Sequence, residues 1–149
     1  MNIYYIIGAF FLLQLIFLII YSAIKKKKNA KLQYETYHRL LPVYNDPNIA
    51  KIALWINIDS VNGNPLNESF LYKTNLKNGI LNPNKVEVAL FNPGAYTFIV
   101  SSNSREEYKN IKMQVLIQPG ITYQLGCNDE GPYFIKDSYP ERYELKAVL

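Results

Sequence analysis

The strongest constraint on this chain is an apolar run near its N-terminus, the 22 residues from Ile3 to Ile24, which contains no charged side chain. At about 1.5 Å of rise per residue, a helix over this run would be about 33 Å long, enough to cross a hydrocarbon core of about 30 Å. Inside a bilayer a helix satisfies its own backbone hydrogen bonds, whereas a lone strand does not. The run therefore predicts a transmembrane helix over residues 1–24.

We expect this helix to be a signal anchor that stays in the mature protein. A cleaved signal peptide has a basic N-terminal flank, a shorter apolar core and a cleavage site with small residues. Here the N-terminal flank has no basic side chain, and the nearest candidate site, Tyr21-Ser22-Ala23, begins with a bulky residue.

The net charge of +4 is concentrated directly after the apolar run. The basic side chains there are Lys25, Lys26, Lys27, Lys28 and Lys31, whereas residues 47–149 hold ten basic and ten acidic side chains. A basic cluster beside a bilayer predicts binding to anionic lipid head groups, at about 1 kcal/mol per charge. Because the remainder of the chain is neutral, we expect no nucleic-acid surface on it.

The same lysines predict the orientation of the span. Short flanks rich in lysine remain in the cytoplasm, which places the N-terminus outside and the C-terminal domain in the cytoplasm. A single cysteine, Cys127, is compatible with a reducing compartment. The alternative orientation makes the domain extracytoplasmic. Within the span, Gln14 is either a helix-packing residue or a tolerated lone amide, and the sequence leaves both interpretations open.

Residues 25–47 form the expected basic juxtamembrane segment. Tyr34, Tyr37, His38 and Leu41 share one face of a predicted helix, which Pro42 is expected to end, with a linker following up to residue 47. Two interpretations are open for residues 29–41: they continue the membrane helix, or they lie on the head groups as an amphipathic piece.

From Ile49 the apolar period changes to two, which is typical of strands with one buried face. Strands are expected over residues 52–58, 70–74, 86–91, 96–100, 111–117, 121–125 and 133–135, with a last one within 143–149. Turn signals separate them, including Asn62-Gly63, Asn78-Gly79, Pro93-Gly94 and Pro119-Gly120. Seven or eight short strands over residues 48–149 predict an all-β antiparallel sandwich of the Ig or transthyretin-like type.

The segments Lys85–Ser102 and Lys112–Leu125 resemble small β-sandwich modules of the PEGA and transthyretin-like (carboxypeptidase-regulatory) families. In each segment an apolar strand meets a Pro-Gly corner, and a tyrosine follows: Tyr96 after Pro93-Gly94, and Tyr123 after Pro119-Gly120. The resemblance extends from Ile52 to about Tyr133. It implies an accessory or interaction module with no common catalytic residues.

The residues give no sign of catalysis. With only His38 and Cys127 as histidine and cysteine, the chain cannot assemble a His/Cys metal cluster, and no phosphate-binding or dinucleotide-binding glycine motif is present. We therefore expect no enzyme activity, cofactor or metal.

The function predicted from these features is a single-pass, membrane-anchored interaction or scaffold module with an unidentified protein partner. Trp55 is the most informative residue, and we favour its burial in the sandwich. If Trp55 is exposed, a patch with Tyr72 or Phe91 would mark the partner surface. The alternatives are an accessory subunit of a membrane complex, such as secretion or envelope machinery, and an extracytoplasmic ligand-binding domain.

Overall fold

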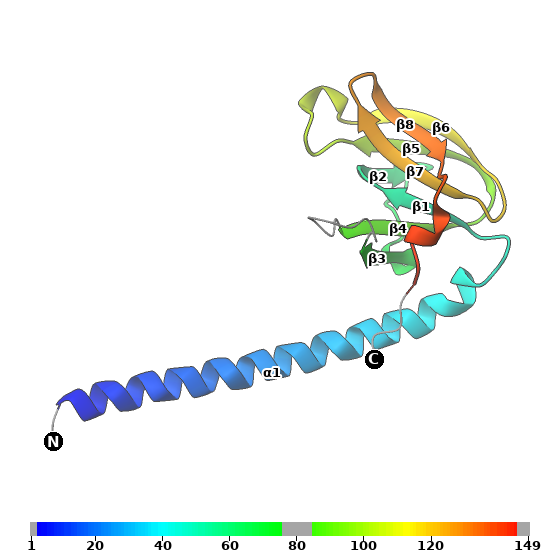
Figure 1. Cartoon of the computed structure of the whole chain (residues 1–149). Coiled ribbons are helices and arrows are strands. Elements are labelled where there is room, and N and C mark those ends of the chain that lie inside the picture. Colours follow the sequence, from blue (N-terminus) through cyan, green and yellow to red (C-terminus); the bar gives the residue numbers. More distant parts are fainter. Residues whose placement is uncertain (1–2, 76–84, 146–149) are drawn as a thin grey trace. The chain divides into compact units, whose positions relative to one another are not determined.

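The computed structural model describes residues 3–75 and 85–145 and separates into two compact units (Figure 1). The first unit contains the N-terminal helix as far as Tyr37, and the second begins at His38 and contains the β strands. The expected turn at Asn78-Gly79 lies outside the described residues.

The helix α1 runs from Ile3 to Tyr44, 42 residues without a break. Between Tyr4 and Ile24 its large apolar side chains are exposed, so the described part of the first unit offers no protein surface that buries them. Among the described residues it is the one helix long and apolar enough to cross a membrane. Exposure of this apolar surface to water is unfavourable, because removing apolar area from water stabilises a protein.

The end of α1 differs from the prediction. The helix continues through residues 29–41, in agreement with the first interpretation of that segment, but it also passes Pro42 and ends at Tyr44. The expected linker from Pro42 to Pro47 is therefore wrong in its first half. Pro42 lies in the last turn of α1, where its missing N–H removes one helical hydrogen bond. The cost is small there, because the last carbonyl groups of any helix already lack partners within the helix.

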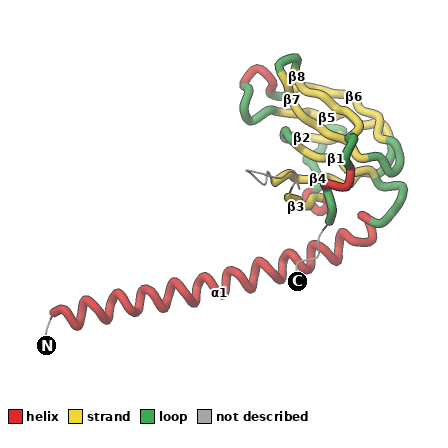
Figure 2. Tube along the Cα trace, viewed as in Figure 1, coloured by secondary structure: helices red, strands yellow, loops and turns green. Residues whose placement is uncertain are grey.

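Eight strands follow in the described part of the chain, which agrees with the expected seven or eight. They are β1 (Ala50–Leu54), β2 (Asn57–Val61), β3 (Leu71–Asn75), β4 (Lys85–Phe91), β5 (Gly94–Ser101), β6 (Ile111–Ile117), β7 (Thr122–Asn128) and β8 (Gly131–Lys136). They form a five-stranded sheet in the order β3-β4-β1-β7-β8 and a three-stranded sheet in the order β2-β5-β6 (Figure 2). Short 3-10 helices lie at Glu68–Phe70, Glu106–Tyr108 and Pro140–Arg142.

Three details of the strand prediction are corrected. The single strand expected over residues 52–58 is two strands in different sheets, separated by a bend at Trp55 and Ile56. The sheets are not wholly antiparallel, because β1 pairs with β7 in parallel. Residues 143–145 form no strand, and the rest of that expected strand lies outside the described residues.

The two Pro-Gly corners connect the two sheets instead of closing hairpins. Pro93-Gly94 joins β4 of the larger sheet to β5 of the smaller one, and Pro119-Gly120 joins β6 back to β7. At the first corner the Tyr96 hydroxyl donates to the carbonyl oxygen of Asn92 (3.0 Å). At the second, the N–H of Gln118 donates to the Tyr123 hydroxyl (3.0 Å). Each tyrosine therefore ties its strand to the residue that precedes the proline.

A central core fills the space between the two sheets. Its buried side chains come from both sheets, and they are Ala50, Ile52, Ile56, Ile58, Ala89, Phe91, Phe98, Val100, Val115, Ile117, Tyr123 and Leu125. The ring of Tyr123 stacks on Phe134, with centroids 4.5 Å apart. This packing of one face of each sheet is what the period-two pattern predicts.

A second core covers the other face of the five-stranded sheet. Its buried residues are Leu40, Ile49, Ala53, Tyr72, Val86, Val88, Leu90 and Tyr143. They come from the end of α1, from β1, β3 and β4, and from the segment after β8. Leu40 is 0% exposed, so the last turns of the helix are part of the folded domain.

Leu40→Ala is expected to lower the free energy of unfolding of the domain by about 2–5 kcal/mol, because it removes a fully buried side chain and leaves a cavity. Urea denaturation of the full chain in detergent, followed by circular dichroism, would measure the change. Leu32→Ala, on an exposed part of the same helix, is the matched control and should change stability little. Equal losses for the two variants would contradict the assignment of Leu40 to the core.

The segment after β8 is fastened by Asp137. The Asp137 Oδ2 atom accepts hydrogen bonds from Tyr143 Oη (2.6 Å) and Gln124 Nε2 (2.7 Å), and Oδ1 accepts from the N–H of Tyr139 (2.7 Å). The Tyr143 carbonyl in turn accepts from Tyr72 Oη (2.6 Å). Partial burial of Asp137 opposes its ionisation, but these donors outweigh that effect and hold the pKa of the carboxyl below its usual value.

A depressed carboxyl pKa gives a stability contribution that is present above the unfolded pKa of about 3.9 and lost as the pH falls through the folded value. We therefore expect the free energy of unfolding to fall as the pH drops below about 4, and to fall less steeply in Asp137→Asn. Urea denaturation at a series of pH values would measure both slopes. Glu141→Gln, an exposed carboxylate on the same segment, is the control; identical profiles for Asp137→Asn and the unaltered chain would refute the role of Asp137.

Candidate interaction surface

A groove opens where the chain leaves the five-stranded sheet for the three-stranded one. The bend between β1 and β2 places Trp55 at this point, and its backbone N–H donates to the carbonyl of Leu125 in β7 (2.9 Å). Trp55 is 40% exposed. The expectation that Trp55 is buried in the sandwich is therefore wrong, because the bend directs residue 55 away from the core that the two sheets share.

The groove has a volume of about 480 Å³. Its lining residues come from the end of β1, the β1–β2 bend, β2, the β2–β3 connection, β4 and the β5–β6 loop. They are Leu54, Trp55, Ile56, Asn57, Ile58, Asp59, Pro65, Leu66, Glu68, Glu87 and Asn103. Segments far apart in the sequence thus meet there because the chain changes sheets. Two of these lining residues are hydrogen-bonded to each other, with Asn57 Nδ2 donating to Asn103 Oδ1 (2.8 Å).

Three carboxylates line the groove, those of Asp59, Glu68 and Glu87. Asp59 Oδ2 accepts a hydrogen bond from the Ser101 hydroxyl. Glu87 pairs with Lys73 in the neighbouring strand, with 3.4 Å between Oε1 and Nζ. Among the described residues that line the groove there is no lysine or arginine. The groove therefore presents an indole ring and negative charge together.

Tyr72 and Phe91 do not join Trp55 in an exposed patch. Tyr72 is 5% exposed and belongs to the second core, whereas Phe91 is 8% exposed and belongs to the central core. The predicted aromatic patch fails because both faces of the five-stranded sheet are covered. Burial also raises the pKa of the Tyr72 hydroxyl, with smaller contributions from Tyr44 and Tyr143.

The remaining predicted residues lie on α1. The side chains of Lys25, Lys26, Lys27, Lys28 and Lys31 are exposed, and Lys31 approaches Glu35 to 3.8 Å. Gln14 is exposed among apolar neighbours. Nothing in the helix tests the binding of the lysines to head groups or the packing of Gln14, and both stay predictions.

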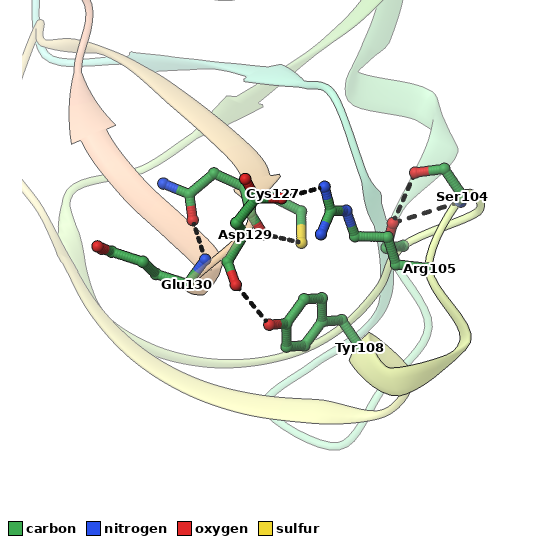
Figure 3. A network of polar contacts seen from close by, with 8 residues as sticks. Ser104, Arg105, Tyr108, Cys127, Asp129 and Glu130 are labelled. Carbon is green, nitrogen blue, oxygen red and sulfur yellow. Dashed lines mark hydrogen bonds and ion pairs between the residues drawn. The ribbon is translucent and has the colours of Figure 1, made fainter.

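A second polar cluster joins the β5–β6 loop to the β7–β8 turn (Figure 3). Arg105 forms an ion pair with Asp129, and Tyr108 Oη donates to the Asp129 carbonyl (2.9 Å). Hydrogen bonding to Asp129 raises the pKa of Arg105. The Cys127 thiol lies 3.6 Å from the carbonyl of Asn128. The packing of the loop against the turn accounts for these contacts.

In the part of the chain that the structure describes, no group of three or more His, Cys, Asp or Glu side chains is arranged to hold a metal ion. An exposed indole with neighbouring carboxylates is suited to a cationic group, which gains from the ring face and from the negative charges. Asp59, Glu68 and Glu87 were not singled out from the sequence; only the turn residues around Asn62-Gly63 hinted that this region changes direction.

No protein-family model, curated protein or solved structure matches this chain.

Proposed function

We propose that this protein is a non-enzymatic, membrane-anchored interaction module that binds a partner through the Trp55 groove. The observation that carries the proposal is the exposed tryptophan that lines a groove of about 480 Å³. A large aromatic side chain exposed beside polar residues is typical of protein-binding sites, where tryptophan is enriched. The exposed apolar stretch of α1 supports the anchoring part of the proposal.

The groove favours a partner segment that carries arginine or lysine. Asp59, Glu68 and Glu87 supply negative charge around the β1–β2 bend, and the pairing of Glu87 with Lys73 offsets part of it. A guanidinium can bind a carboxylate through two parallel hydrogen bonds while its plane stacks on an aromatic ring. An arginine side chain therefore uses both features of the groove at once.

The transthyretin-like class of the sandwich is part of the same proposal. Two packed sheets and the two tyrosine-tied Pro-Gly corners support it. Any assignment of the sandwich to a particular family must also account for the parallel pairing of β1 and β7.

Trp55 is the only tryptophan in the chain, so its fluorescence reports on the groove directly. Titration of the full chain in a neutral detergent with a short arginine-rich peptide should shift the emission and saturate. Glu68→Gln and Glu87→Gln should each weaken the binding about two- to fivefold, because an exposed charge contributes about 0.4–1 kcal/mol.

Two controls make this titration specific. A glutamate-rich peptide of equal length should leave the emission unchanged, and Glu144→Gln, an exposed carboxylate that does not line the groove, should bind the arginine peptide like the unaltered chain. If the emission stays constant, or if Glu144→Gln weakens binding as much as Glu68→Gln, the groove is not the binding site.

We further propose that the β domain faces the cytoplasm. The support is the lysine cluster that directly follows the apolar run, since such flanks are retained on the cytoplasmic side.

The orientation can be measured with a single cysteine at an exposed loop position, Ser104→Cys in a Cys127→Ser background. An impermeant maleimide should label this chain only after the cells are lysed. A cysteine introduced into the cytoplasmic loop of a membrane protein of known topology is the control for permeability. Labelling in intact cells would place the domain outside the cytoplasm, and the search for partners would move to the cell envelope.

A further inference from the structure

The edge strands of the two sheets differ in how they are protected from pairing with another chain. Among the described strands, β2, β3, β6 and β8 each have a neighbour on one side only. An edge strand presents unpaired backbone N–H and C=O groups that can pair with another chain. Proteins usually protect such edges with short strands, bulges, prolines or charged side chains.

Three of these edges carry such protection. The strand β2 has five residues and a shift of register between Ile58 and Ser60. The strand β3 has five residues and carries the exposed Lys73. The strand β8 contains Pro132 and ends at Lys136.

The remaining edge, β6, is open by these criteria. It has seven residues, no proline and one charged side chain, Lys112. It pairs with β5 in unbroken register from Ile111 to Ile117. Its inward residues, Val115 and Ile117, are buried in the central core.

The outward face of β6 also leaves apolar surface uncovered. Lys112, Gln114 and Leu116 point outward and are exposed. Leu116 is 66% exposed, the highest value among the large apolar side chains described in the β domain. A partner strand beside β6 would cover this side chain as well as the backbone edge.

We propose that β6 is a self-association edge, at which two copies of this chain pair antiparallel about Gln114. In that register Gln114 faces its own equivalent, Lys112 of one copy faces Leu116 of the other, and Ile111 faces Ile117. Residues directly opposite in an antiparallel pair lie on the same face, so the inward apolar residues stay inward and the outward ones stay outward. The two three-stranded sheets thereby become one continuous six-stranded sheet.

The register about Gln114 suits the sequence of β6 better than the registers about Lys112 and Met113. Pairing about Gln114 uses all seven residues of the strand. Pairing about Lys112 would set two like charges opposite each other, which is destabilising. Pairing about Met113 moves Leu116 opposite Asn110, a residue with φ of 54° that lies outside the strand. The chosen register instead lays the aliphatic stem of Lys112 over Leu116.

Attachment to a membrane favours this association, because copies confined to one surface meet at a much higher effective concentration than in solution. This step uses the apolar span of α1 and does not rest on the Trp55 groove.

The proposal can be tested by cross-linking the purified full chain in vesicles of phosphatidylethanolamine and phosphatidylglycerol. Gln114→Cys in a Cys127→Ser background should form a disulfide-linked dimer under mild oxidation, because residues opposite each other lie about 4.5–5.5 Å apart. Lys112→Cys is the matched control. Its two copies would be separated by four residues of strand, about 13 Å, and should give little dimer.

A pair of charge substitutions distinguishes a loss of strand pairing from a loss of folding. Adding Leu116→Lys to the Gln114→Cys chain places two lysines opposite each other and should reduce the dimer yield about tenfold, since each unfavourable pair occurs twice in the symmetric dimer. Adding Lys112→Glu as well should restore the dimer, because the introduced glutamate of one copy then faces the introduced lysine of the other. A variant that merely misfolds would not be rescued in this way.

Three results of these vesicle experiments would overturn the proposal. They are equal dimer yields for Gln114→Cys and Lys112→Cys, a yield unchanged by Leu116→Lys, and a loss that Lys112→Glu does not restore. If Gln114→Cys in cells cross-links only to a different protein, β6 accepts a foreign strand and the second-copy assignment is wrong.

Discussion

The fold depends on the burial of both faces of the five-stranded sheet. One face packs against the three-stranded sheet, and the other is covered by the end of α1 and by the segment that contains Tyr143. A sheet covered on one side would leave Tyr72, Val88 and Leu90 in water. Because apolar burial contributes about 25 cal/mol per Å², the second cover is a major part of what stabilises this small domain.

The packing of α1 on the second face of the sheet means that two parts of this helix need different surroundings. The helix contributes exposed apolar residues over Tyr4–Ile24 and a buried leucine at position 40. The first part requires a nonpolar environment, and the second requires the β domain. A chain cut at Ile49 would therefore lack part of its own core, which is a physical reason for regarding the domain as beginning at His38.

The repeated change of sheet determines where the surface is available for binding. Among the described strands, the chain crosses between sheets at the β1–β2 bend, in the β2–β3 connection and at both Pro-Gly corners. Tyrosine hydrogen bonds stabilise the two corners. At the bend, by contrast, Trp55 is exposed and lines the groove with Asp59 and Glu87. The groove and the β6 edge consist of different residues, so the two proposed binding sites can be tested independently.

The apolar span, the positions of most strands and the places where tyrosines follow Pro-Gly could all be predicted from the sequence. These are local properties: hydrophobic length and period-two alternation are written into consecutive residues. Three features became visible only in the folded domain: residues 52–58 divide between two sheets, Trp55 is exposed, and Tyr72 and Phe91 are buried. The period-two alternation of apolar residues is the same in a straight strand and in a bent one. It also does not show which segments cover the second face of the five-stranded sheet. That information resides in contacts between distant segments, such as Leu40 with the sheet and Tyr143 with Tyr72.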